Sequence, residues 1–167
     1  MEKLSHFVQQ PNAFMQERGM IALGRLGSQA QAAAPLVDRL IDESNFSQKP
    51  EAAFALWQIT GETERTLEVL RQLMDDPTYE NRVYDALTKM GSAAAPLAEQ
   101  LAEKLKSEDQ SLRLIVVEAL AAMGAAARDQ REALQASLQD ADRDVALAID
   151  RALVAIGKAS DEELDPY

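Results

Sequence analysis

Five glycines recur along the chain at nearly constant intervals, and each follows a helix-forming segment rich in alanine and leucine. Successive members are 34, 30, 33 and 33 residues apart. A fixed period of this size is typical of repeat proteins, in which one helical hairpin stacks on the next. The spacing therefore restricts the fold class strongly, although none of these glycines belongs to a catalytic motif. The five are Gly27, Gly61, Gly91, Gly124 and Gly157.

Aligning the repeats on these glycines produces columns of matching side chains. Positions one, four, five and eight residues before the glycine lie on one face of a helix with 3.6 residues per turn. We expect this face to form the core. We also expect each glycine to end its helix with left-handed backbone angles, because it has no Cβ atom to oppose them. The position four before the glycine holds Leu23, Trp57, Leu87, Leu120 and Leu153, and the position eight before holds Gly19, Ala53, Val83, Val116 and Ile149.

A second helix is predicted after each of the first four glycines. Its apolar residues recur at three- or four-residue spacing, as in Leu97, Leu101 and Leu105. Pro35 and Pro96 precede such runs and suit the first turn of a helix, where the N–H that proline lacks has no partner in any case. Acidic loops then separate the hairpins, and their carboxylates interact favourably with the following helix starts. The unit is therefore helix, glycine turn, helix and acidic loop.

This unit resembles the HEAT-repeat family, in its short form known as phycobilisome-lyase-type HEAT-like repeats. The resemblance covers roughly residues 12–159 and implies an all-α fold. It implies a right-handed α-solenoid, with about four full repeats and terminal half repeats. No run of residues alternates in the manner of a strand. The segments that carry the resemblance are Glu118–Gly124 (EALAAMG), Ala22–Gly27 (ALGRLG) and Gly91–Leu97 (GSAAAPL).

A core shared by all hairpins predicts a single domain over residues 1–167. The second repeat is expected to be the most irregular, because its Trp57–Thr60 segment departs from the usual ending. Asp150 stands in a column that is apolar in the inner repeats, as a solvent-facing cap requires. An alternative is that the natural protein continues past this end, since terminal repeats need capping. The predicted divisions are a cap helix at 1–10, repeats at 12–45, 46–76, 77–109 and 110–142, a half repeat at 143–159 and an acidic tail at 160–167.

The formal net charge is −11, and the acidity is concentrated in the second half of the chain. Residues 1–74 carry 7 basic and 9 acidic side chains, whereas residues 75–167 carry 10 and 19. No basic stripe able to neutralise phosphates is visible, so we expect neither nucleic acid nor an anionic membrane as a partner. The acidic half either attracts a basic protein or simply keeps an alanine-rich chain soluble.

The chain contains no cysteine, which excludes disulfides and thiolate metal sites. The first residues show no basic region followed by an apolar run, so no signal peptide is expected. No apolar stretch approaches the about 18 residues that a membrane span requires. We expect a cytoplasmic protein without a cofactor.

Enzyme chemistry has few candidate residues. His6 is the single histidine, so a two-histidine metal site is excluded, and Ser5 beside it is adjacency in sequence rather than catalytic geometry. Asp140, Asp142 and Asp144 are spaced like the start of a calcium loop, but the required glycine and distal glutamate do not follow. We therefore expect that the protein is not an enzyme.

The sequence favours a protein-binding scaffold, because the second helices of such arrays usually line a concave surface that binds extended partners. Trp57 and Tyr84 are expected in the core, whereas Phe46 lies in a polar loop and is either tucked under the next helix or offered to a partner. The family name suggests an alternative, a subunit of a bilin lyase or a chromophore-handling chaperone. The candidate partner-binding residues are Arg39, Phe46, Arg71, Glu99, Glu103 and Gln135.

Overall fold

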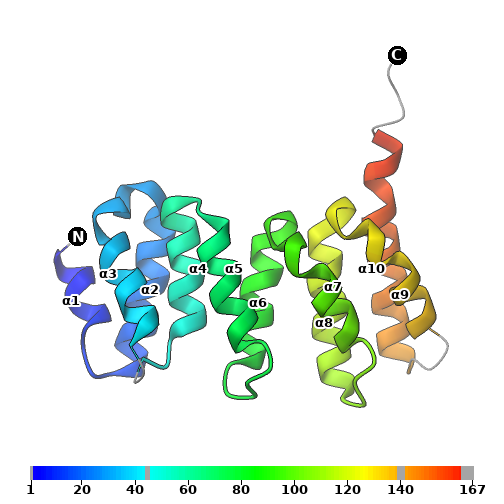
Figure 1. Cartoon of the computed structure of the whole chain (residues 1–167), viewed down its shortest axis with the longest axis horizontal. Helices are drawn as coiled ribbons and strands as arrows, with labels where there is room; N and C mark the ends of the chain where they lie inside the picture. Colours follow the sequence, from blue (N-terminus) through cyan, green and yellow to red (C-terminus); the bar gives the residue numbers. More distant parts are fainter. Residues whose placement is uncertain (1, 44–45, 139–141, 163–167) are drawn as a thin grey trace. The chain divides into compact units, whose positions relative to one another are not determined.

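A computed structural model describes residues 2–43, 46–138 and 142–162, and this part of the chain is helical with no strand (Figure 1). The predicted all-α class is therefore confirmed. The chain forms two compact units, Met1–Ala86 and Leu87–Tyr167, where the repeat pattern predicts one continuous domain. The boundary between the units falls inside a helix, α6 (Glu80–Met90).

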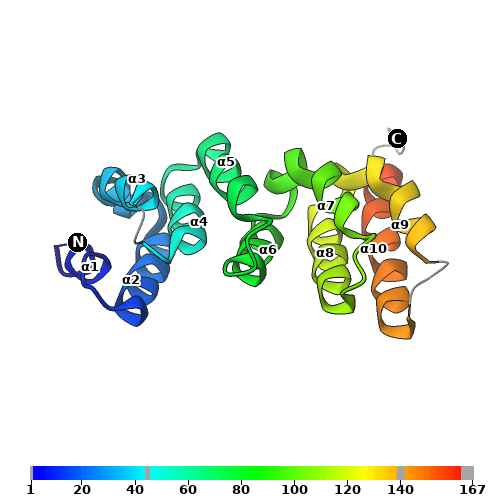
Figure 2. The ribbon, with the colours of Figure 1, turned by 60° about the horizontal axis from the view of Figure 1, so that its bottom comes forward.

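In the first unit, helix α4 is central, because it packs against α2, α3 and α5, while α1 packs against α2. Figure 2 shows α3 and α5 along one edge of this unit and α2 and α4 along the other. The unit therefore has two layers of helices. Its elements are α1 (Glu2–Val8), α2 (Ala13–Leu26), the 3-10 helix η1 (Gly27–Ala33), α3 (Ala34–Asp42), α4 (Lys49–Thr60), α5 (Thr63–Leu73) and the first part of α6.

In the second unit, α8 packs against α10, while α7 packs against α8 and α9 packs against α10. This arrangement again pairs each first helix of a repeat with a second helix. The remaining elements are η2 (Gly91–Leu97), α7 (Ala98–Lys104), α8 (Gln110–Met123), η3 (Gly124–Gln130), α9 (Arg131–Ser137) and α10 (Arg143–Glu162).

Four of the five period-setting glycines end a helix with a positive φ angle, but the full left-handed cap that was predicted is not found at all of them. Gly61 has φ 75° and ψ 0°, which is the left-handed helical region. Gly27 and Gly124 instead combine φ angles of 54° and 58° with ψ angles of −134° and −137°. The prediction is wrong for Gly157, because α10 continues through it to Glu162. The residues that follow Gly157, KASDEE, are compatible with a helix and contain no proline, so nothing in the local sequence stops α10 there.

A 3-10 helix follows three of the glycines, and the sequence analysis did not predict it. The segments η1, η2 and η3 are rich in alanine, with the sequences GSQAQAA, GSAAAPL and GAAARDQ. The second repeat differs, because Glu62 leads directly from Gly61 into α5. The hydroxyl of Thr60 donates to the carbonyl of Leu56 at 2.8 Å and accepts from the N–H of Glu62 at 3.0 Å, which orders this shorter turn. The second repeat therefore departs from the other three, as expected.

The predicted columns form the core of both units. All five residues eight positions before the glycine are buried. At the position four residues before the glycine, Leu23, Leu87 and Leu120 are fully buried, whereas Trp57 and Leu153 are only half-buried. Trp57 was expected in the core; it lies at its edge beside Phe54, with 5.6 Å between ring centroids.

The polar loops supply helix caps. The carboxylate of Asp109 accepts from the backbone N–H of Ser111 at 2.8 Å at the start of α8, and Asp142 accepts from Asp144 at 3.0 Å at the start of α10. Asn12 performs the same role for α2 by accepting from Met15 at 3.1 Å. Side-chain acceptors at these positions satisfy N–H groups that have no partner within the helix.

One helical stretch of the described residues, Gln110–Ser137, is long and apolar enough to cross a membrane by length and composition. The expectation that no apolar stretch approaches the length of a membrane span is therefore wrong for this segment. The stretch combines α8, η3 and α9, and the positive φ of Gly124 interrupts it. Helix α8 has 14 residues, or about 21 Å, which is less than the about 30 Å of a hydrocarbon core. Its buried residues, among them Val116 and Leu120, belong to the core of the second unit.

Candidate functional site

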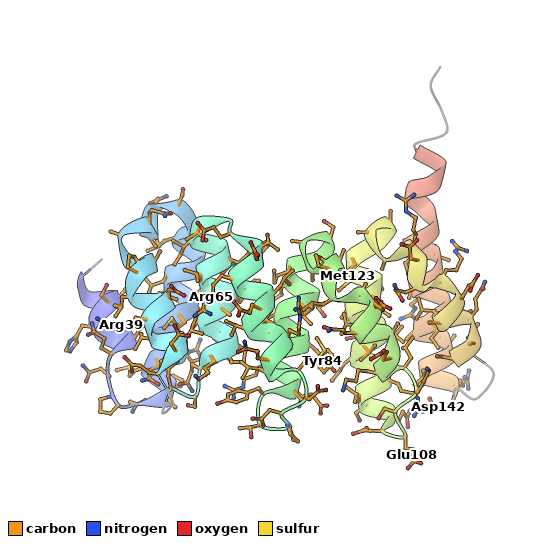
Figure 3. The ribbon with its side chains drawn as sticks, viewed as in Figure 1. Arg39, Arg65, Tyr84, Glu108, Met123 and Asp142 are labelled. Atoms are coloured by element: carbon orange, nitrogen blue, oxygen red, sulfur yellow. The ribbon has the colours of Figure 1, made fainter. Side chains whose placement is uncertain are left out.

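Five of the six candidate partner-binding residues have exposed side chains on second helices. In the first unit, Arg39 lies on α3 (Figure 3). Arg71 lies on α5. In the second unit, Glu99 and Glu103 lie one turn apart on α7, and Gln135 lies on α9. These side chains face solvent in the intervals between buried apolar positions, so they are accessible to a partner, while their role remains a prediction.

Phe46 is the exception, because only 2% of its surface is exposed. The backbone N–H of Phe46 donates to the carbonyl of Glu43 at 3.2 Å, in the turn before α4. The aromatic ring is therefore part of the core, which is the first of the two alternatives considered for it. An apolar ring in a polar loop gains free energy by burial against the neighbouring helices, and Phe46 is removed from the candidate partner contacts.

Arg65 of the first unit forms ion pairs with three carboxylates, and it is not among the candidate residues of the sequence analysis. Its Nε donates to Asp38 Oδ1 at 3.0 Å, and its Nη2 donates to Asp42 Oδ1 at 2.7 Å. Its Nη1 lies 3.7 Å from Glu68 Oε2 on its own helix. Hydrogen bonds first to Asp42 and then to Asp38 raise the pKa of the Arg65 guanidinium above its ordinary value. Arg65 thus joins α5 to α3 as a permanent cation.

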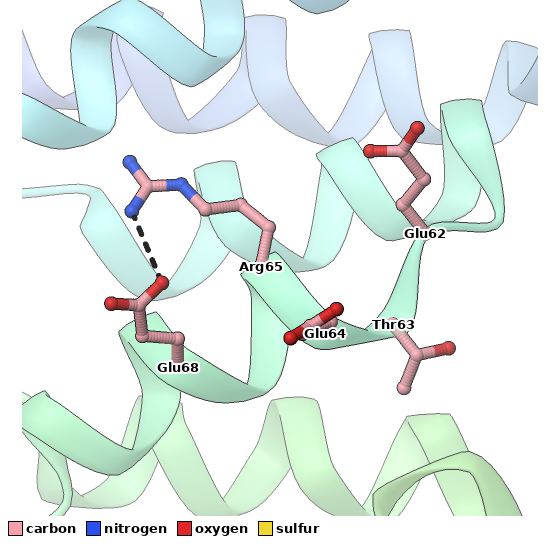
Figure 4. Close-up of a pocket in the computed structure, with 5 residues that line it drawn as sticks. All are labelled: Glu62, Thr63, Glu64, Arg65 and Glu68. Carbon is pink, nitrogen blue, oxygen red and sulfur yellow. Dashed lines mark ion pairs between the residues drawn. The ribbon is translucent and has the colours of Figure 1, made fainter.

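A shallow pocket of about 450 Å³ surrounds the first turn of α5 (Figure 4). Charged side chains dominate its lining, which has no large apolar group. Small-molecule sites are usually concave and mostly apolar. The pocket is therefore better suited to a polar contact on a surface than to enclosing a ligand. The lining residues are Glu62, Thr63, Glu64, Arg65 and Glu68.

A second ion pair orders the loop before α4. Arg82 of α6 donates to Glu51 Oε2 at 3.4 Å and to the carbonyl of Ser47 at 3.0 Å. Burial raises the pKa of the Glu51 carboxyl, and a backbone hydrogen bond and Arg82 partly oppose that rise. The positive charge of Arg82 therefore compensates the negative charge of Glu51, whose side chain is only 18% exposed. This ion pair has a structural role.

The second unit has a groove of about 360 Å³ between α7, α9 and the start of α8. Arg113 donates to the carbonyls of Ser107 and Glu108 at 2.7 and 3.0 Å, and to Asp142 Oδ2 at 3.3 Å. These bonds hold the loop before α8 against the start of α10, so the guanidinium is occupied by the fold. The groove is lined by Ala102, Leu105, Lys106, Ser107, Arg113, Ala133, Ala136 and Ser137.

Asp142 is the acidic counterpart of Arg113. It accepts hydrogen bonds from the backbone N–H groups of Asp144 and Val145 and from Nε2 of Gln110 at 2.9 Å. The bond from Val145 contributes most to lowering the pKa of the Asp142 carboxyl, with Asp144 and Arg113 adding to it. Of the three acids spaced like a calcium loop, Asp140 lies outside the described residues. Asp142 faces its own helix start, which assigns it a capping role.

Three of the ion pairs between helices join residues about one glycine interval apart, whereas Arg65 and Asp42 are 23 residues apart. Arg65 and Asp38 are 27 residues apart, Arg113 and Asp142 are 29 apart, and Arg82 and Glu51 are 31 apart. Each separation is close to one repeat. Residues one repeat apart in an array of stacked hairpins occupy adjacent positions. Opposite charges spaced by about one period therefore predict inter-repeat ion pairs, and the sequence analysis did not search for them.

The titratable residues form no recognisable catalytic constellation among the described residues. No group of three or more His, Asp or Glu side chains there is arranged to hold a metal ion. His6 is exposed on α1, where its Nε2 lies 2.9 Å from Nε2 of Gln10. Burial, with the charges of Glu80 and Asp75, raises the pKa of the buried Tyr84 phenol, which keeps this phenol in its neutral form.

Comparison with known proteins adds no further assignment, since no model of a known protein family matches the chain and no curated protein matches it either.

Proposed function

We propose that the chain is a HEAT-like α-solenoid that acts as a protein-binding scaffold, with the exposed faces of its second helices as the contact surface. In this proposal the protein performs no catalysis, carries no cofactor and acts in the cytoplasm. The helical hairpins, the near-constant period and the buried glycine-aligned columns support the repeat architecture.

The observation that carries the proposal is the α3–α5 face of the first unit. Arg65 connects the two helices through Asp38 and Asp42, so the exposed Arg39 and Arg71 are presented by elements that are already fixed to each other. A preorganised surface loses less conformational entropy on binding than a flexible one. The face mixes both signs of charge, which favours specificity and fast association over apolar burial.

In the second unit, the proposed contact surface also consists of exposed polar side chains on a second helix. Glu99 and Glu103 are one helical turn apart on the exposed side of α7. Two carboxylates at this spacing present parallel acceptors to a basic segment. A partner that binds through them is expected to be sensitive to salt, because exposed charges are screened at moderate ionic strength.

The test is affinity capture from native cell extract on the immobilised chain, with quantitative mass spectrometry. The two variants are Arg39→Ala/Arg71→Ala and Glu99→Ala/Glu103→Ala/Gln135→Ala. The matched control, Ser111→Ala/Glu118→Ala, removes exposed polar side chains from the first helix α8. We expect one protein to be retained in a fixed ratio by the wild type and the control. At least one second-helix variant should reduce its retention about ten-fold, the effect of losing about 1.4 kcal/mol of binding.

Retention that is equal for the wild type and both second-helix variants would contradict the assignment of the surface. An equal loss for the first-helix control would do so as well. Circular dichroism of each variant checks that the helices are intact. A partner that is released when salt is added identifies the charged residues as the recruiting groups.

A further inference from the structure

Exposed apolar side chains gather on the first two helices of the chain. Six large apolar side chains of the described residues are exposed, and four of them lie on α1 and α2. Phe14 is the most exposed of all, with 61% of its surface in contact with solvent. An exposed aromatic ring beside other apolar side chains is typical of a surface that contacts a partner. The four are Phe7, Phe14, Met15 and Leu26.

The outward side of α2 has the residue spacing of a helix that packs against another helix. Met20 and Leu23 are buried on the inward side of α2. The outward residues follow one another at intervals of four, three and four residues, which places them in one line along the helix. The same alternating interval occurs where two helices pack in a coiled coil. Apolar and basic side chains alternate along this line, which we call the α2 row: Phe14, Arg18, Ile21 and Arg25.

The α2 row is ordered before any partner binds. The guanidinium carbon of Arg18 lies 5.2 Å from the centroid of the Phe14 ring, which is the distance of a cation–π contact. Arg25 lies in the last turn of α2, where a cation interacts favourably with the helix dipole. A surface whose side chains are already restrained loses less conformational entropy on binding.

The α2 row is positively charged, although the chain as a whole carries a formal net charge of −11. Among the described side chains of α1 and α2, Glu17 is the only carboxylate. It lies about 100° around the helix from Arg18, and its charge acts on Glu51 of α4. Glu17 therefore lies at the edge of α2 that faces α4. The row itself combines two cations with apolar groups and contains no acid, so its charge is complementary to an acidic partner.

We propose that the α2 row binds an acidic amphipathic helix of another protein. Apolar side chains of that helix cover Phe14 and Ile21, and two of its carboxylates, seven residues apart, accept hydrogen bonds from Arg18 and Arg25. Hydrogen bonds between guanidinium and carboxylate groups are strong and directional, and the apolar contacts beside them contribute affinity. Helix α2 belongs to the layer opposite α3 and α5 (Figure 2), so this site is distinct from the second-helix surface of the proposed function.

The charge distribution favours a single helix over an anionic membrane. A membrane is an extended surface, so it is repelled by the net negative charge of the whole chain. A single helix contacts only the row, and exposed charges more than about 10 Å away are largely screened at 0.1 M salt. The positive charge of the row therefore determines the attraction for a helix.

The test measures the binding of a fluorescent synthetic helix to the full chain by fluorescence anisotropy. The acidic peptide has leucine and glutamate alternating at four- and three-residue intervals, in a background of alanine and glutamine, over about three heptads. We expect saturable binding that weakens as salt is added.

Two variants of the row should each weaken binding of the acidic peptide about ten-fold or more: Phe14→Ala and Arg18→Gln/Arg25→Gln. Alanine and glutamine are good helix formers and these side chains are exposed, so α2 should remain folded, which circular dichroism checks. The matched control is Arg39→Gln/Arg71→Gln, which makes the same change in net charge on α3 and α5 and should bind like the wild type.

Charge reversal tests whether the arginines contact the carboxylates directly. A second peptide has lysine in place of each glutamate. Relative to the wild type, Arg18→Glu/Arg25→Glu should bind the acidic peptide less tightly and the lysine peptide more tightly. An equal change for both peptides contradicts the pairing of opposite charges.

A wild type that does not bind the acidic peptide overturns the proposal. A control variant weakened as much as Arg18→Gln/Arg25→Gln also overturns it. Sedimentation velocity of the chain alone and flotation with phosphatidylserine vesicles test the other occupants. If the chain binds itself or the vesicles through Phe14 but does not bind the peptide, the row belongs to a second copy or to a membrane, and the proposal is wrong. The control changes Arg39 and Arg71 of the proposed function, so the two proposals fail independently.

Discussion

Replacing glycine by alanine should destabilise the protein at one of the period-setting positions, Gly124, and should not destabilise it at another, Gly157. Gly124 has φ 58° and ψ −137°, and an added Cβ atom would meet nothing within 4 Å. The cost of Gly124→Ala is therefore purely conformational. Backbone angles this far from the allowed regions of an L-residue cost about 1–3 kcal/mol. We expect Gly124→Ala to destabilise the second unit by that amount.

Gly157 lies inside α10, where alanine is favoured over glycine by about 1 kcal/mol. An added Cβ atom would lie 2.9 Å from Nη2 of Arg131, the flexible end of a long side chain that can move away. Gly157→Ala is therefore expected to be neutral or to stabilise the protein by up to about 1 kcal/mol. Both glycines belong to the same unit, so each variant serves as the control for the other.

The measurement is urea unfolding followed by the helical circular-dichroism signal, with unchanged urea dependence as the check that the same surface is exposed. In thermal unfolding, each kcal/mol corresponds to a shift of about 2–4 °C for a chain of this size. A Gly157→Ala variant destabilised as much as Gly124→Ala would refute the reasoning, since it would mean that α10 ends at Gly157. A neutral Gly124→Ala would refute it as well, because the positive-φ conformation at this position would then not need glycine.

Three further outcomes follow from the structure. Leu120→Ala should destabilise the protein by about 2–5 kcal/mol in urea unfolding, because the side chain is fully buried and its removal leaves a cavity; a loss as small as that of an exposed alanine substitution contradicts its core position. Arg65→Met should cost about 1 kcal/mol or less in the same assay, since the side chains of Asp38 and Asp42 are 48% and 68% exposed, and a much larger loss would show that the link between α3 and α5 is more than a surface ion pair. Because hydrogen bonds lower the pKa of Asp142, its stabilising contribution is complete above the ordinary carboxyl pKa of about 4 and is lost as the pH falls through the lower pKa of the folded state. The stability difference between wild type and Asp142→Ala should therefore be largest at neutral pH and shrink in acid, and a difference that grows in acid would reverse the assigned sign.

The core could be predicted from the sequence because it depends on a single periodicity. Once the glycines set the register, the position eight residues before each of them had to face a neighbouring helix, and all five residues there are buried. The partial exposure of Trp57 could not be predicted in the same way. A large indole shares its column with leucines, but its exposed fraction depends on the volume left by adjacent helices, which a one-dimensional alignment does not contain.

The candidate site was predicted less well, because charged residues were assigned one helix at a time. Arg39 and Arg71 are exposed on their helices, as the local pattern indicates. Arg65 looks similar in sequence but donates its two hydrogen bonds to carboxylates on another helix. Its role follows only when α3 and α5 are placed side by side. Phe46 was included among the candidate partner contacts for the same reason, since its polar neighbours in sequence do not reveal that its ring is buried.

The glycines of this chain meet different physical needs although they are the same residue type. Gly124 is required by its backbone angles. Gly19 has ordinary helical angles, but an added Cβ atom would lie 2.6 Å from Cγ1 of Val8, so its need is close approach between α1 and α2. Gly24, three residues before a turn glycine, makes room for the side chain of Gln58 on the next first helix. A period in sequence detects glycines that are required by the backbone angles of a turn, because the turns recur at that period. It cannot detect glycines that are required by close approach, because close approach depends on which residue the adjacent helix presents. This is why Gly157, which has the correct spacing but continues a helix, was assigned incorrectly, and why spacing must be combined with the residues that follow each glycine.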